Sequence, residues 1–73
     1  MIAREHGLNA RQALVVERLL EHADIGIEEF EGLSPGVHRR TLQRDLQGLV
    51  DRGVVVPRGA ARAVRYLLQH KML

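Results

Sequence analysis

Hydrophobic residues recur at intervals of three and four over three stretches of the chain, which is the spacing of amphipathic helices. The first predicted helix runs from about Ala10 to His22, with Asn9 as its N-cap and Gln12 completing a capping box. Leu8 is placed to pack back onto the first turn. The inward face of this helix is predicted to carry Ala13, Val16, Leu19, Leu20 and Ala23. Asp24 and Gly26 are expected to end it.

A second, shorter helix is predicted from Ile27 or Glu28 to about Gly32. Its first turn carries Glu28 and Glu29, which suit the positive end of the helix dipole. Phe30 and Leu33 supply a buried side. The second helix is therefore expected to be short, acidic and anchored by an aromatic ring.

A turn at Ser34, Pro35 and Gly36 leads into a third helix, predicted from about Arg39 to Asp51. Helical spacing places Leu42, Leu46, Leu49 and Val50 inward and turns Arg40, Thr41, Arg44 and Gly48 to solvent. His38 is a poorer N-cap than a small hydroxyl residue. Gly48 costs about 1 kcal/mol of helix propensity relative to alanine. Either it lets a phosphate backbone approach closely, or it is simply tolerated at a surface position.

A β-hairpin is predicted after the third helix, which Gly53 ends as its C-prime residue. Val54 to Val56 form a short strand that ends at Pro57, and Val64 to Leu68 form the returning strand. The loop between them is basic. Ile25 is expected to be extended and to add a one-residue bridge to a sheet.

The order of helix, helix, turn, helix and hairpin predicts a winged helix-turn-helix, a mainly α fold of three helices plus a small β-hairpin wing. Seventy-three residues allow one domain, and a chain of this length buries only about 60% of its unfolded surface. We expect a flexible segment over residues 1–8, the winged helix-turn-helix domain over 9–68 and a C-terminal tail over 69–73.

Charge is divided unevenly along the chain, although the net charge is only +2. Residues 1–34 carry three arginines against seven carboxylates, a balance of −4, whereas residues 35–65 carry seven arginines against two aspartates, a balance of +5. Such polarity is typical of a protein that turns one face to an anionic partner.

Catalytic and metal-binding chemistry is not predicted. The chain has no cysteine, and its four histidines are too far apart in sequence for a ligand motif. Ser34 precedes a proline turn without an evident base, and no phosphate-binding glycine loop is present. No stretch has the length of a signal peptide or membrane span. We therefore expect a cytoplasmic protein that is not an enzyme, has no cofactor and no metal site, and does not contact a membrane.

The segment from Arg39 to Leu46, followed by Leu49 to Gly53 and then Gly59, Arg62, Tyr66 and Leu68, resembles the DeoR-type winged helix-turn-helix. It is also similar to the C-terminal winged-helix modules of Fic-type adenylyltransferases and of some ATP-binding transcriptional regulators. The resemblance covers roughly residues 9–68 and implies a DNA-binding domain.

Double-stranded DNA is the predicted partner, because a cationic helix of this fold enters the major groove and its N-terminal side chains meet base edges. Arginine pairs with guanine and glutamine with adenine, while threonine reaches a phosphate or a thymine methyl. The predicted contacts on the third helix are Arg39, Arg40, Thr41, Gln43, Arg44 and Gln47.

In the hairpin, Arg58, Arg62 and Arg65 are predicted to lie along flanking phosphates or in the minor groove. Alternatively, Arg62 or Arg65 pairs with the acidic second helix. Asp45 is expected to fix a neighbouring arginine or a backbone amide, and Phe30 and Tyr66 are expected in the core. The alternative function is protein interaction, in which the second helix and the wing mediate self-association or docking to a neighbouring domain.

Overall fold

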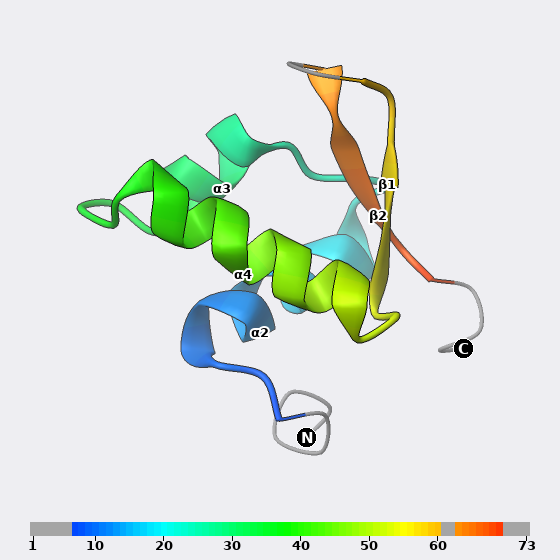
Figure 1. Cartoon of the computed structure of the whole chain (residues 1–73), viewed down its shortest axis with the longest axis horizontal. Helices are drawn as coiled ribbons and strands as arrows, with labels where there is room; N and C mark the ends of the chain where they lie inside the picture. The colour runs from blue at the N-terminus through cyan, green and yellow to red at the C-terminus, as the bar shows by residue number, and fades with distance from the viewer. Residues whose placement is uncertain (1–6, 61–62, 70–73) are drawn as a thin grey trace.

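The computed structural model describes residues 7–60 and 63–69 of the chain. Three helices, α2 (Ala10–Glu21), α3 (Ile27–Leu33) and α4 (Arg39–Asp51), precede a hairpin of β1 (Val55–Arg58) and β2 (Arg65–Leu68). Figure 1 shows the hairpin standing beside the helices, with α4 across the front of the molecule. The predicted order of elements and the predicted fold class are confirmed.

Local signals position the helix ends as expected. The side-chain oxygen Asn9 Oδ1 accepts from the backbone nitrogen of Gln12 at 2.8 Å, and Gln12 Oε1 accepts from the backbone nitrogen of Asn9 at 3.0 Å. The predicted capping box therefore forms. Gly53 follows α4 with φ of 74°, the left-handed conformation of a helix-terminating glycine. His38 is a better cap than expected, because its Nδ1 accepts from the Arg40 nitrogen at 3.0 Å.

The hairpin pairs antiparallel, and Ile25 bridges the other side of β2 at Tyr66, which confirms the predicted one-residue bridge. Tyr66 exchanges both backbone hydrogen bonds with Ile25, at 2.8 and 3.0 Å. Pro57, opposite Tyr66 on β1, therefore occupies a position that needs no N–H donor. For this reason the strand does not end at Pro57, as predicted, but continues to Arg58.

The core lies where the three helices meet the base of the hairpin. Phe30, Leu42 and Leu49 are fully buried and Leu46 is 1% exposed, so the predicted inward face of α4 is confirmed. Tyr66 and Val50 are half-buried and pack against this core. The buried hydrophobic residues are Val15, Val16, Leu19, Ile25, Phe30, Leu42, Leu46, Leu49, Val54 and Val55.

The buried stripe of α2 is turned relative to the prediction. Val15 is fully buried and Gln12 is 8% exposed. Leu20 and Ala23 were both predicted to point inward, but Leu20 is 58% exposed and Ala23 is exposed as well. The reason is that Gln12 reaches α4, where its Nε2 donates to the Asp45 carbonyl oxygen at 3.0 Å. A polar residue therefore occupies a place on the buried face that hydrophobic spacing alone does not assign to it.

Gly48 is half-buried and lies against α2, whereas it was predicted to turn to solvent. A Cβ built at Gly48 would lie 2.8 Å from Gln12 Nε2. The glycine thus makes room on α4 for the Gln12 side chain of α2, and neither a phosphate approach nor surface tolerance explains it.

Replacing Gly48 by alanine should leave the free energy of unfolding nearly unchanged. The gain of about 1 kcal/mol in helix propensity is offset by the loss of a buried hydrogen bond of about the same value. In a Gln12→Ala background the same replacement should stabilise by about 1 kcal/mol, because the space is then vacant. Urea denaturation of the four proteins measures this coupling. Equal effects of Gly48→Ala in both backgrounds would show that Gln12 does not use that space.

The predicted end segments are only partly described. Leu8 packs against the core, and the Gln69 nitrogen donates to the Val54 carbonyl at 2.9 Å, which continues the hairpin ladder by one residue. Gly7 is exposed in a turn, and residues 1–6 of the predicted flexible segment and 70–73 of the predicted tail lie outside the described residues.

Candidate nucleic-acid interface

The solvent face of α4 carries five of the predicted contact residues. Those exposed are Arg39, Arg40, Gln43, Arg44 and Gln47, while the opposite side of the same helix is packed into the core. Thr41 is half-buried, so it lies at the edge of this face and not at its centre. The arrangement holds long polar side chains on a helix whose own position is set by buried leucines.

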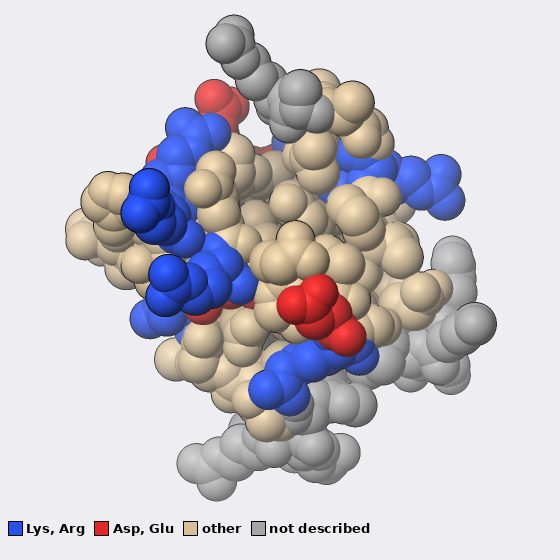
Figure 2. Space-filling view, in the orientation of Figure 1, with Lys and Arg blue, Asp and Glu red and all other residues tan. Residues whose placement is uncertain are grey.

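Arg40, Arg44 and Arg58 have no ion pair with any carboxylate in the described part of the chain. The Arg39 side chain is 52% exposed and lies 3.9 Å from a Glu31 carboxylate oxygen, the long end of the ion-pair range. Figure 2 shows basic side chains gathered over the N-terminal half of α4. Their charges are therefore available to an anionic ligand.

Gln47 is restrained by a neighbour on its own helix. Its Nε2 donates to Asp51 Oδ1 at 2.9 Å, one turn further along α4. The carbonyl oxygen and the second amide hydrogen of Gln47 have no partner in the described structure. The amide keeps one acceptor and one donor for a ligand.

The hairpin arginines are placed differently from one another. Arg58 is exposed at the end of β1, whereas Arg62 lies outside the described residues. Arg65 Nη2 contacts Asp24 Oδ1 at 2.7 Å and Glu29 Oε1 at 2.5 Å. The structure thus forms the alternative that the sequence left open, in which a hairpin arginine pairs with the acidic second helix.

These contacts tie the hairpin to α3 and to the residues before it. Glu29 Oε1 also accepts from the Gly26 nitrogen at 3.1 Å, so one carboxylate caps α3 and holds Arg65. Hydrogen bonding to Asp24, aided by Glu29 and opposed by partial desolvation, raises the pKa of Arg65. A cleft of about 570 Å³ lies between the start of α3 and the hairpin, lined by Gly26, Ile27 and Val64 among others, and Arg39 at the start of α4 also lines it. The Arg65 guanidinium is occupied by the carboxylates of Asp24 and Glu29, so it is less available to a phosphate than the arginines of α4.

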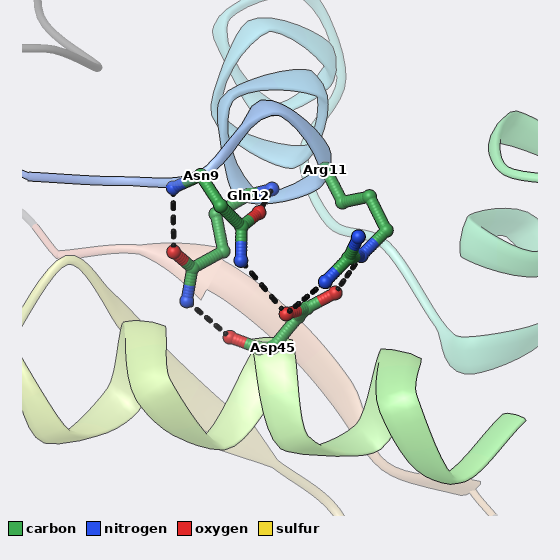
Figure 3. Close-up of polar contacts among 4 residues, drawn as sticks. All are labelled: Asn9, Arg11, Gln12 and Asp45. Atoms are coloured by element: carbon green, nitrogen blue, oxygen red, sulfur yellow. Dashed lines mark hydrogen bonds and ion pairs between the residues drawn. The ribbon is translucent and has the colours of Figure 1, made fainter. Parts of the chain in front are cut away.

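Asp45 is the buried polar centre between α2 and α4 (Figure 3). Its side chain is 6% exposed, and its carboxylate accepts from Arg11 Nε at 2.5 Å, Arg11 Nη2 at 3.3 Å and Asn9 Nδ2 at 3.0 Å. The expectation that Asp45 fixes a neighbouring arginine is confirmed. Hydrogen bonding and the Asp45 charge, opposed by slight desolvation, raise the pKa of Arg11.

The capping box of α2 has a second role that sequence reasoning missed. Asn9 and Gln12 each use a side-chain oxygen within the box and donate a side-chain amide hydrogen to Asp45. An aspartate in place of Asn9 or a glutamate in place of Gln12 would cap equally well, but an ionised carboxylate has no hydrogen to donate. The sequence did contain a signal for this contact: both capping-box residues, Asn9 and Gln12, have side-chain amides, and Asp45 is a carboxylate next to the inward-facing Leu46 of α4.

Two further features concern the described part of the chain. No group of three or more His, Cys, Asp or Glu residues there is arranged to hold a metal ion. Within the same residues, no helix is both long enough and apolar enough to cross a membrane.

Comparison with known proteins bears on the fold. No protein-family model matches the chain, and no curated protein matches it significantly. Among solved structures, it is similar to the neutron crystal structure of dissimilatory sulfite reductase D (DsrD), with a TM-score of 0.74 and 20% sequence identity. The match covers 90% of this chain and 100% of DsrD. The fold is winged-helix-like.

The resemblance to DeoR-type domains and to modules of Fic-type or ATP-binding regulatory proteins was wrong, since no such family model matches and the structural neighbour is DsrD. The segment that suggested it, Arg39 to Leu46, combines inward leucines with outward arginines. Any cationic amphipathic helix packed on a small core shows that combination. The motif therefore indicated the helix correctly but not the family.

Proposed function

We propose that this protein is a double-stranded DNA-binding module that acts in transcriptional regulation in the cytoplasm, alone or within a larger chain. One observation carries the proposal: Arg40 and Arg44, one turn apart on α4, are exposed and have no carboxylate partner in the described structure. Placing two unneutralised guanidinium groups on a rigid helix is unfavourable in isolation, and an anionic ligand would relieve their repulsion. No catalytic role is proposed.

In the proposed complex, α4 enters the major groove, where B-form DNA admits a helix and A-form RNA does not. Arg40 and Arg44 pair with guanine edges, and the amides of Gln43 and Gln47 pair with adenine. Thr41, at the edge of the face, contacts a phosphate or a thymine methyl. Arg39 and Arg58 lie along the phosphates on either side. Each contact uses a side chain that the structure leaves wholly or partly exposed.

Binding to a short duplex should weaken steeply as salt rises. The four arginines of this surface, on phosphates or in the groove between them, should displace three or four condensed counterions, which predicts a slope of log affinity against log salt of about −3 to −4. Fluorescence anisotropy with a labelled duplex over a series of salt concentrations measures the slope. Chemical-shift mapping of the same complex should move the amides of residues 39–47 and of Arg58, and leave those of residues 17–29 in place.

A protein-docking function is the second candidate. On α2 the side chain of Leu20 is 58% exposed and that of Leu14 is 39% exposed, although both are large and hydrophobic. If the unmodified protein does not bind a duplex at low salt, the DNA proposal fails. If an added partner instead shifts the amides around Leu14 and Leu20, docking becomes the better account.

A further inference from the structure

Arg11 presents two different edges to its surroundings. Its Nε and Nη2 donate to the two carboxylate oxygens of Asp45, a side-on bidentate pair. Its Nη1 has no partner in the described structure, and the side chain is 36% exposed while that of Asp45 is 6% exposed. One edge of the guanidinium is therefore fixed from within the protein, and the other is open to solvent.

The Arg11 guanidinium lies on the side of the N-terminal half of α4, and its open edge points away from Asp45. Successive residues on a helix are about 100° apart, so Asp45 is one step around from Arg44, on the flank that faces α2. Figure 3 shows Arg11 approaching Asp45 from the side of the N-terminal half of α4, with Asn9 and Gln12 on the other side. The N-terminal half of α4 is the part that carries Arg39, Arg40 and Arg44.

Asp45 cannot easily turn away from this arrangement. Asn9 Nδ2 donates to its carboxylate at 3.0 Å, and Gln12 Nε2 donates to its carbonyl oxygen at 3.0 Å. A guanidinium held by so fixed a carboxylate has already lost most of its side-chain freedom before a ligand arrives. Its remaining N–H groups suit the oxygens of a phosphate.

We propose that Arg11, on α2, is a phosphate-contacting residue of the DNA interface and that Asp45 is the positioning residue that holds it ready. The proposal rests on the proposed DNA-binding function. In it, Asp45, Arg11 and a backbone phosphate lie in a row, and the phosphate contacts of the protein extend from α4 onto the N-terminal turn of α2. Such a contact contributes to affinity for every duplex without selecting a sequence.

Replacing Arg11 by methionine should weaken binding to a mixed-sequence duplex about tenfold, the value of one charged hydrogen-bonded contact. The slope of log affinity against log salt should become shallower by up to about 0.9. Arg18→Met is the matched control, because Arg18 is exposed on the same helix and has no partner in the described residues. It should leave both quantities almost unchanged.

Asp45→Asn separates positioning from mere folding. In the Asp45→Asn protein, residue 45 has no charge, so adding Arg11→Met does not leave a buried carboxylate without a partner. The double variant can therefore be measured even if Arg11→Met alone unfolds the protein. The salt slope should still become shallower, but the loss of affinity caused by Arg11→Met should be several-fold smaller than with Asp45 present. Thermal melts must show each variant folded at the temperature of the titration.

The outcomes distinguish the two proposals. If the unmodified protein binds no duplex, both fail. If it binds a duplex but Arg11→Met and Arg18→Met show the same slope of log affinity against log salt, Arg11 does not contact a phosphate. In that case the proposal for Arg11 fails and the proposed DNA-binding function stands. If Arg11→Met weakens binding equally with and without Asp45, the positioning role of Asp45 is overturned.

Discussion

Replacing Leu46 by alanine is expected to lower the free energy of unfolding by about 2 to 5 kcal/mol. Leu46 is 1% exposed and lies in the core cluster formed by the three helices and the hairpin. The change removes its buried methyl groups and leaves a cavity that a small core cannot easily close. Since small domains are stable by only about 5 to 15 kcal/mol, the loss is a large share of the total. Thermal and urea unfolding measure it.

Leu20→Ala is the matched control for this prediction. It is the same substitution on another helix, but the Leu20 side chain is 58% exposed, so the expected change is within about 0.5 kcal/mol. An unchanged melting temperature for Leu46→Ala, or a larger loss for Leu20→Ala, would contradict the assignment of the core.

Replacing both Arg40 and Arg44 by alanine should remove most of the duplex binding while the melting temperature stays nearly unchanged. Each side chain is exposed, so no buried contact is lost. Loss of two phosphate or guanine contacts should cost about 1 to 3 kcal/mol each and reduce the salt slope by up to about two units. Anisotropy titrations and thermal melts of the same samples measure both effects.

A double change of Arg40 and Arg44 to lysine tests how these residues act. Lysine keeps the charge but loses the planar fork that pairs with guanine, so the salt slope should persist while preference among sequences falls. Preserved sequence preference in the lysine variant would show that the two arginines serve as charges alone. Undiminished binding by the alanine variant would remove α4 from the interface.

The candidate site shows how far periodicity reaches. The exposure of Arg40, Gln43 and Arg44 followed from helical spacing, and the structure places all three in solvent. For Arg65 the sequence left open a pairing with the acidic second helix, which Glu29 provides. It did not identify Asp24, which lies 41 residues away in sequence and is brought near by the return of the hairpin. Arg11 was missed for the same reason, since its exposure beside α4 depends on how α2 packs.

The remaining differences between the predicted and the observed structure arise from contacts between residues that are distant in sequence. The capping box of Asn9 and Gln12 spans three residues, so the sequence alone was enough to predict it. That Gln12 is buried and that Gly48 makes room for it are consequences of a contact between residues 36 positions apart. Hydrophobic spacing turned Gly48 to solvent and gave no place on the buried face to Gln12, because it records which residues are apolar and not which helix lies opposite them.

The sequence by itself determined the three helices, the turn before α4 and the cationic face, since each depends on interactions within about four residues along the chain. The hairpin was also predicted, because β-branched residues favour strands and its two strands are close in sequence. Tertiary structure alone decided that Asp45 is held by three side chains of the α2 N-terminus, that Arg65 is bound to carboxylates, and that β1 continues through Pro57. These outcomes depend on the angle at which helices pack and on which strand edge meets Ile25. Residue spacing carries no information about either, because packing is settled by the shapes and hydrogen-bonding needs of side chains that are distant in sequence.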